Sequence, residues 1–271
     1  MLLTIDCGNT HVVFGIFDHS VLSYSWRIDT SATNNKEHFF ETFKEKLKNL
    51  NLTIKHIKYV ILASVVNEAE SCFNFFEKSL SIPVLSISSS LLEVPIEIDL
   101  LEPSQVGADR LVNAVAGSSL TQSDVIIVDF GTATTFDIVT MVSGMPIYKG
   151  GIIAPGVNLS LEVLTRAASK LPKIDLSIHP TKVSVIGKNT VDAMWSGIIW
   201  GYVGLIEGII HRIEVETGNS FRIIATGGLA SLYLPYCELI KWQEPNLTLL
   251  GLKQIAAVSY THLTLPTNSR V

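Results

Sequence analysis

Two segments of the chain share one pattern of apolar and polar positions. Each begins with an apolar run typical of a buried strand, passes through an aspartate into a glycine-containing polar turn, and returns to an apolar run. The segments are Leu2–Asp18, LLTIDCGNTHVVFGIFD, and Val125–Thr140, VIIVDFGTATTFDIVT. Aligning Asp6 with Asp129 gives an offset of 129 − 6 = 123 positions, close to half of the 271 residues. The pattern therefore predicts an internal duplication of a strand–turn–strand unit.

The first half of the chain continues with strands and amphipathic helices. Apolar residues recur at helical spacing after the possible cap residues Thr33 and Asn34, whereas continuous or alternating apolar runs predict strands. We expect strands at Val12–Phe17, Val21–Arg27, Tyr59–Ser64 and Val84–Ser88, and helices at Lys36–Leu50, at Asn67–Leu80 and from Pro103 onward.

The most apolar segment, Ala193–Ile210, lies in the second half. Its length would suit a membrane span, but four glycines and Glu207 interrupt it. Three of the glycines fall on one helical face, which favours a helix buried in the core or against a second subunit. The remaining elements expected here are helix caps at Asn189 and Thr190, a helix from about Asn158 to Lys170, and a strand at Phe221–Gly228 that ends in a double glycine.

Composition narrows the class of protein. The chain is 47% hydrophobic and carries a formal charge of −5, so it lacks the basic stripe that nucleic-acid binding requires. Its three cysteines have no metal-ligand spacing, and the N-terminus shows no leader pattern, so we expect free thiols in a cytoplasmic protein that binds neither nucleic acid nor membrane. Residues 259–271 lack periodicity and are expected to be a tail, either a cloning sequence or a flexible end.

The two aspartate turns indicate a phosphate site. Backbone N–H groups and hydroxyls can bind phosphate oxygens, and carboxylates can hold the accompanying cation. A single turn of this kind could equally be a polar hairpin, but two copies and a third glycine-rich strand end favour nucleotide binding. The chain contains no Walker A sequence, no G-x-G-x-x-G opening a helix and no protein-kinase signature.

Asp109 and Arg110 form a second candidate site. As neighbours on a helix they could simply be a surface pair of little energetic value. Gly107 is expected inside the same helix, where glycine costs stability and permits a ligand to approach the backbone.

Repeated Asp-Gly-Thr turns resemble those of the actin-like, hexokinase and Hsp70 superfamily. The resemblance implies an α/β fold of duplicated RNase H-like (actin-like ATPase) domains with a cleft between them. We expect residues 1–117 to form the N-terminal half and residues 118–258 the C-terminal half.

Within that superfamily, six segments in order resemble the type III pantothenate kinases. They are DCGNTHVVFG at Asp6–Gly15, EPSQVGADRLVNAVAG at Glu102–Gly117, DFGTATTFD at Asp129–Asp137, GGIIAPG at Gly150–Gly156, IGKNTVDAMWSGI at Ile186–Ile198 and ATGGLA at Ala225–Ala230. The resemblance implies ATP-dependent phosphorylation of pantothenate, the first step of coenzyme A synthesis. Leu100 stands where members of the family often have a tyrosine.

The resemblance also implies a role for individual residues. Asp109 would be the general base, and Asp129 would bind K⁺ or NH₄⁺. Asp6 would help bind Mg²⁺. The ATP phosphates would be bound by Asp6, Gly8, Asn9, Thr10, His11, Val12, Val13 and Thr132. Pantothenate would be bound by Leu100, Gly107, Ala108, Asp109, Arg110 and Thr190, the last of these near a homodimer interface.

Two other functions remain open at this stage. One is a non-catalytic accessory protein related to transcription, although intact Asp6, Asp109 and Asp129 favour catalysis. The other is a different phosphotransferase or phosphatase of the superfamily, of the acetate-kinase or exopolyphosphatase type, which is not expected to carry the Gly107–Arg110 block.

Overall fold

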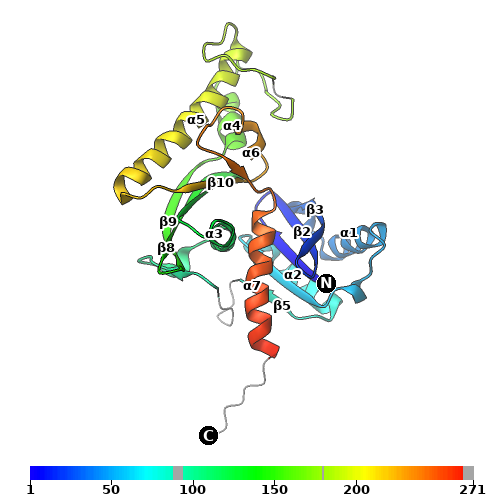
Figure 1. The fold of residues 1–271 in the computed structure, drawn as a ribbon. Helices are drawn as coiled ribbons and strands as arrows, with labels where there is room; N and C mark the ends of the chain where they lie inside the picture. The colour runs from blue at the N-terminus through cyan, green and yellow to red at the C-terminus, as the bar shows by residue number, and fades with distance from the viewer. Residues whose placement is uncertain (88–93, 179, 265–271) are drawn as a thin grey trace. The chain divides into compact units, whose positions relative to one another are not determined.

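The computed structural model describes residues 1–87, 94–178 and 180–264 (Figure 1). The chain divides into two compact units. The first consists of Met1–Ser119 together with the segment that begins at Asn246, and the second is Leu120–Pro245. The second unit is therefore inserted in sequence between the parts of the first.

The first unit is built on a five-stranded sheet with the order β3-β2-β1-β4-β5. Its first three strands form an antiparallel meander, and the last two are added in parallel to β1. The strands are β1 (Leu2–Cys7), β2 (His11–Asp18), β3 (Val21–Asp29), β4 (Tyr59–Ser64) and β5 (Val84–Ser86).

Two helices, α1 (Lys36–Asn49) and α2 (Glu70–Leu80), cover one face of this sheet through an aromatic core. Phe14 of β2 stacks on Trp26 with ring centroids 5.2 Å apart, and Phe43 meets Phe76 edge to face at 4.8 Å. Rings in such arrangements stabilise a core beyond the area they bury. Phe73 and Phe76 of α2 thus belong to the core of the first unit.

The opposite face of the first sheet carries α7 (Leu247–Thr264). A Cβ on Gly15 of β2 would lie 3.0 Å from Leu249, and the hydroxyl of Tyr260 donates to the Val60 carbonyl at 3.0 Å. The expected assignment of residues up to 258 to the C-terminal half is therefore wrong, because α7 packs on the first sheet. The expected tail is also wrong at its start, since the helix continues to Thr264. Residues 265–271 lie outside the described residues.

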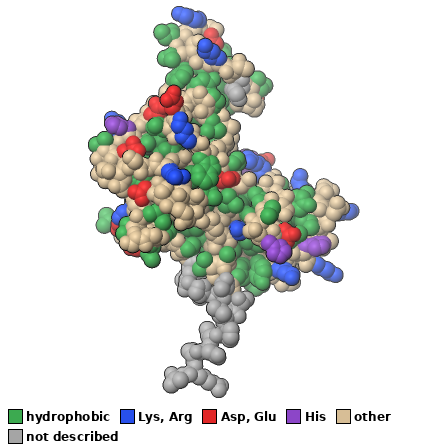
Figure 2. Space-filling model, in the orientation of Figure 1, with side chains coloured by type: hydrophobic (Ala, Val, Ile, Leu, Met, Phe, Trp, Pro, Cys, Tyr) green, Lys and Arg blue, Asp and Glu red, His purple; other side chains and the backbone are tan. Residues whose placement is uncertain are grey.

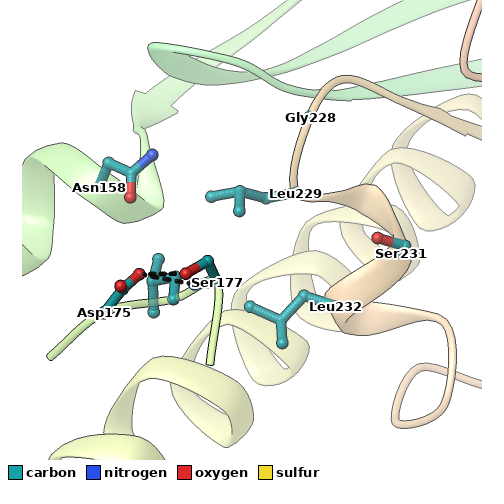
Figure 3. Close-up of a pocket in the computed structure, with 8 residues that line it drawn as sticks. Asn158, Asp175, Ser177, Gly228, Leu229, Ser231 and Leu232 are labelled. Atoms are coloured by element: carbon teal, nitrogen blue, oxygen red, sulfur yellow. Dashed lines mark hydrogen bonds between the residues drawn. The ribbon is translucent and has the colours of Figure 1, made fainter. Parts of the chain in front are cut away.

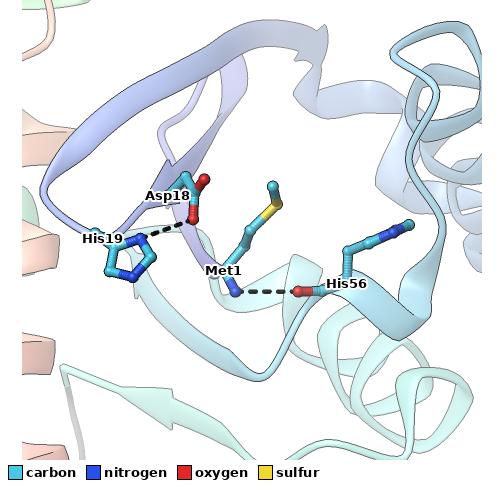
Figure 4. Close-up of polar contacts among 4 residues, drawn as sticks. All are labelled: Met1, Asp18, His19 and His56. Carbon is cyan, nitrogen blue, oxygen red and sulfur yellow. Dashed lines mark hydrogen bonds and ion pairs between the residues drawn. The ribbon is translucent and has the colours of Figure 1, made fainter.

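The remaining elements of the first unit are short, apart from α3. They are α3 (Ala108–Thr121), the two-residue strand β6 (Glu97–Ile98), and 3₁₀ turns at Thr30–Asn34, Ile54–His56, Asn67–Ala69 and Pro103–Gln105. The amino group of Met1 donates to the His56 carbonyl at 3.1 Å, and His19 contacts Asp18 in the β2–β3 turn at 3.1 Å (Figure 4).

The second unit repeats the plan of the first. Its strands lie in the order β11-β10-β7-β8-β9, with an antiparallel β7-β8-β9 meander, β10 parallel to β7 and β11 parallel to β10. The five strands of each unit thus have the same order in the sheet and the same parallel or antiparallel pairings, as the predicted duplication requires. The strands are β7 (Val125–Phe130), β8 (Ala133–Val142), β9 (Met145–Pro155), β10 (Arg222–Thr226) and β11 (Trp242–Gln243).

Three helices belong to the second unit: α4 (Val157–Ala167), α5 (Thr190–Thr217) and α6 (Ala230–Tyr233). By length and composition alone α5 could cross a membrane. Its buried side chains, however, form one stripe that packs into the apolar core of the second sheet, with Ile199, Ile206 and Ile210 almost fully buried. This stripe confirms the prediction that the segment forms a buried helix. On the face drawn in Figure 2, acidic and basic side chains are interspersed.

Two local expectations need correction. The helix expected from Pro103 is interrupted, because Val106 is extended (φ −71°, ψ 125°), so that Gly107 precedes α3 instead of lying within it. The cap of α1 is Asn35, not Thr33 or Asn34, and its side chain accepts from the His38 N–H at 3.0 Å. Of the two predicted caps of α5, Asn189 is confirmed, since it accepts from the Asp192 N–H at 2.9 Å, whereas Thr190 is the first residue of the helix itself.

Candidate active site

The first aspartate turn connects β1 to β2 and is held in shape by backbone contacts. The Gly8 N–H donates to the His11 carbonyl at 3.0 Å. Thr30 then fixes both sides of the turn, because its hydroxyl donates to the Gly8 carbonyl at 2.6 Å and its N–H donates to the Thr10 carbonyl at 3.0 Å. Asn9 and Thr10 are exposed at the tip. A preformed turn of this kind can offer N–H groups to a phosphate without reorganising.

The remaining residues expected at the first turn differ in exposure. Asp6 is half-buried at the end of β1, and His11 lies 3.4 Å from the Asp29 carboxylate. Val12 is fully buried in the core, so only its backbone can take part in binding. Val13 pairs with Asp6 across the two strands.

The second aspartate turn connects β7 to β8 and is one residue shorter. Here the Gly131 N–H donates to the Ala133 carbonyl at 3.1 Å. Gly156, which caps α4, lies so close to the Thr132 carbonyl that any side chain on Gly156 would collide with it. Thr132, within the β7–β8 turn, therefore lies against the N-terminus of α4. The N–H groups at a helix N-terminus favour negative charge.

Asp129 lies in an oxygen-rich cradle formed by three strands. It pairs with Thr135 on β8 and with Thr226 on β10. Gly227 has φ +88°, and a Cβ there would collide with Oδ1 of Asp129. Carboxylate, hydroxyl and carbonyl oxygens are the ligands that hard cations take, so these residues fit a monovalent cation. The described residues contain no group of three or more His, Cys, Asp or Glu that could hold a metal by themselves.

Asp109 lies in the first turn of α3. Its Oδ1 accepts from the Arg110 N–H at 2.8 Å and lies 2.6 Å from the position that a Cβ on Gly107 would take. The carboxylate therefore folds back over the start of the helix, into space that only glycine leaves open. Ala108, Arg110 and Leu100 are partly buried in the same unit.

Thr190 is the last of the expected substrate residues. It is exposed at the first position of α5, in the second unit with Asp129 and Thr132. The structure thus places residues 6–13, Leu100 and the Gly107–Arg110 block in the first unit, and Asp129, Thr132 and Thr190 in the second.

A cavity of about 430 Å³ opens in the second unit (Figure 3). Asp175 accepts from the N–H and the hydroxyl of Ser177 at 2.9 and 2.7 Å, and the hydroxyl contributes most to lowering the pKa of this exposed carboxyl. The sequence singled out only the double glycine of this site, because the other residues come from separate segments. The cavity is lined by Asn158, Asp175, Leu176, Ser177, Gly228, Leu229, Ser231 and Leu232.

The duplicated sheets, each with an Asp-x-Gly turn after its first strand, define an actin-like α/β fold. A protein from Campylobacter jejuni described as a Baf family transcriptional activator superimposes with a TM-score of 0.59 at 18% identity, covering 96% of this chain and 99% of the other. A protein from Sinorhizobium meliloti described as a 2-dehydro-3-deoxygalactonokinase superimposes with a TM-score of 0.53 at 11% identity, covering 100% of this chain and 99% of the other. At these identities the likeness shows the fold alone.

Sequence comparison defines the family. The family described as type III pantothenate kinase matches residues 2–212. The type III pantothenate kinase of Desulfosudis oleivorans is 41% identical over 257 residues, covering 95% of this chain and 99% of that protein. The one from Geobacillus thermodenitrificans is 40% identical over 258 residues, covering 93% and 96%. The chain belongs to the type III pantothenate kinase family.

Proposed function

We propose that this protein transfers the γ-phosphoryl group of ATP to the primary hydroxyl of pantothenate, giving 4′-phosphopantothenate for coenzyme A synthesis. The observation that carries this proposal is the intact Gly107–Arg110 block, with its carboxylate held at the start of α3, in a chain that matches the family over nearly its whole length. The accessory role and the other phosphotransferase activities have no comparable observation in their favour.

Asp109 accepts the proton of the pantothenate hydroxyl as that oxygen attacks the γ-phosphorus. An aspartate is a weak base, but phosphoryl transfer has a loose transition state in which positioning and charge neutralisation contribute more than basicity. Arg110 offers a charged donor to the substrate, and Gly107 and Ala108 offer backbone at the helix start. Leu100 can supply only apolar contact where relatives often have a tyrosine.

The residues proposed to bind the ATP phosphates belong to the two aspartate turns. In the first unit they are residues 8–13, through N–H groups and side chains, and in the second unit the residue is Thr132. Asp6 assists the Mg²⁺ ion that accompanies ATP. The cavity in Figure 3 takes the adenosine end, because its Gly228 wall belongs to the same loop that packs on Asp129 through Gly227.

Asp129 holds a monovalent cation, K⁺ or NH₄⁺, in the cradle formed with Gly227. Such an ion supplies positive charge next to the phosphates when it is bound. Lysine, which provides this charge in many nucleotide sites, does not occur in either aspartate turn.

The enzyme acts as a homodimer through the exposed face of α5. Gly197, Gly201 and Gly204 lie on this face, and a Cβ on any of them would meet nothing within 4 Å. Thr190 lies on the same face by helical spacing. Leu159 and Val163 of the adjacent α4 are exposed by 46% and 44%. Two copies packed here would bury these apolar groups and bring Thr190 to the interface.

A coupled kinase assay tests the proposal. Purified full-length protein with pantothenate, ATP and Mg²⁺ should form 4′-phosphopantothenate, and K⁺ should increase the rate. Protein that leaves pantothenate unchanged with both cations present contradicts the proposed activity. A rate independent of K⁺ and NH₄⁺ contradicts only the cation site. The three buried free cysteines agree with the expected cytoplasmic location, which stays a prediction.

A further inference from the structure

A second carboxylate, Asp137, lies on the same face of the second sheet as Asp129 and has no part in the proposed reaction. Side chains alternate along a strand, and Val128 and Phe136 belong to the apolar core on one face. The neighbouring positions Asp129 and Asp137 therefore project from the other face. Asp137 is fully buried, whereas Asp129 is only partly buried.

Thr135 connects the two carboxylates. It is the direct partner of Asp129 in the β7–β8 pair, so the two Cβ atoms are about 5 Å apart, while Asp129 and Asp137 are diagonal neighbours at about 7–8 Å. The Thr135 hydroxyl donates to Oδ2 of Asp137 through a long hydrogen bond of 3.5 Å. A hydroxyl that donates its proton to Asp137 keeps its oxygen lone pairs for a cation beside Asp129.

Tyr148 of β9 holds Asp137 from the other side. Its hydroxyl donates to Oδ1 of Asp137 at 2.7 Å, and its side chain is only 1% exposed. This contact depends on a β-bulge, since the β8–β9 register shifts between Ile138 and Val139 and Gly150 has φ +107°. Without the shift, Lys149 would face Val139 and Tyr148 would project from the opposite face.

We propose that Asp137, held by Tyr148, is a positioning residue for the cation that Asp129 binds. It orients the hydroxyl of Thr135 toward the site and places a second negative charge nearby. Two carboxylates on one face repel each other, and a cation between them relieves that repulsion. The inference deepens the proposed function and rests on its cation site at Asp129.

The test measures cation binding without turnover. Thallium(I), a K⁺ substitute observable by NMR, is titrated into the full-length protein, and the K⁺-dependent rise in Tm is followed in parallel. Tyr148→Phe removes one oxygen and keeps the buried ring. We expect Tyr148→Phe and Asp137→Asn to raise the Kd for Tl⁺ about tenfold, as loss of a residue that orients a metal ligand typically does. Because the defect lies in cation binding, high K⁺ should restore the turnover of Tyr148→Phe.

Two adjacent threonines give a matched control. Thr135→Val should weaken Tl⁺ binding as Tyr148→Phe does. Thr134→Val makes the same change on the opposite face, where the buried Thr134 hydroxyl has no hydrogen-bond partner among the described residues. This variant should bind Tl⁺ like the wild type and be equally or more stable.

The outcomes separate the inference from the function. A folded Tyr148→Phe variant with wild-type affinity for Tl⁺ overturns the inference, and so does equal loss in Thr134→Val and Thr135→Val. A wild-type kinase that binds no Tl⁺ overturns the cation site and the inference together, and leaves the kinase activity intact. The wild-type protein could also lack kinase activity while Tyr148→Phe and Thr135→Val, but not Thr134→Val, weaken Tl⁺ binding. That result supports the inference and contradicts the proposed function.

Discussion

The carboxylate of Asp109 occupies space that Gly107 leaves open, with Oδ1 2.6 Å from the position of the absent Cβ. Real Cβ atoms do not approach an oxygen this closely, so any other residue at 107 would displace the carboxylate. Gly107 has no positive φ, so its backbone conformation is open to other residues. Gly107 therefore has a spatial role in addition to the proposed contact of its backbone with the substrate.

Gly107→Ala should lower kcat and leave the fold intact. Alanine fits this backbone and should change the free energy of unfolding by no more than about 1 kcal/mol, with stabilisation expected. A shift of about 1 Å in a reacting group can cost on the order of 100-fold in rate, so kcat should fall 10- to 100-fold. Steady-state kinetics and Tm measure the two effects. Ser104→Ala, at an exposed position, is the control; an unchanged kcat in Gly107→Ala would refute the spatial role.

Asp109→Asn should remove most of the turnover. The asparagine carbonyl can still accept from the Arg110 N–H, so the geometry at the start of α3 is kept while the proton acceptor is lost. General-base catalysis contributes about 10²- to 10⁴-fold, and kcat should fall within that range. The lost charge at a helix N-terminus costs about 0.3–1 kcal/mol, which corresponds to a small drop in Tm. A variant with near wild-type kcat would show that Asp109 is not the base.

Gly201→Glu distinguishes a free face of α5 from a dimer interface by the sign of its effect. On a free surface, replacing a glycine in the helix interior should stabilise the protein by about 0.5–1 kcal/mol. At a packed interface, the new charged side chain would separate the subunits. We expect a monomer by analytical ultracentrifugation and reduced turnover, because Thr190 would leave the shared site. Gly201→Ala is the graded control, and a variant that stays in the wild-type oligomeric state with raised Tm would argue against the interface.

Stability should fall between about pH 9 and pH 11. Burial raises the pKa of the Cys7 thiol from 9.0 to about 11, and burial does the same for Cys72. The folded state therefore holds these protons more tightly. Their contribution is fully present below pH 9 and is lost as the pH rises through 11, at about 3 kcal/mol per thiol. Urea unfolding across this range measures the loss, and Cys72→Ala should reduce its slope. An identical slope in both proteins would contradict the assignment.

The sequence predicted the parts of the fold that local pattern determines. The two aspartate turns, the duplicated meander and the Asn189 cap all follow from residues close together in the chain. The place of α7 does not, because its apolar residues could cover either sheet, and only tertiary packing selects the first one. The same limit applies to the cavity in Figure 3, whose walls come from three separate segments.

The sequence pattern also could not predict where an element boundary or a strand register shifts by one residue. An extended Val106 is enough to move Gly107 out of α3, and a one-residue bulge at Lys149 is enough to turn Tyr148 toward Asp137. Apolar alternation alone would have assigned Tyr148 to the opposite face. Both features concern the residues around the candidate site, where local conformation departs from the regular pattern.

The inserted order of the two units has a consequence for biosynthesis. During translation the second unit emerges complete, whereas the first sheet keeps one face uncovered until α7 has left the ribosome. Buried apolar residues of α7, such as Leu249 and Leu252, close that face. The turn at Gly8–Thr10, although synthesised first, thus joins two strands whose second face is covered only by this later helix.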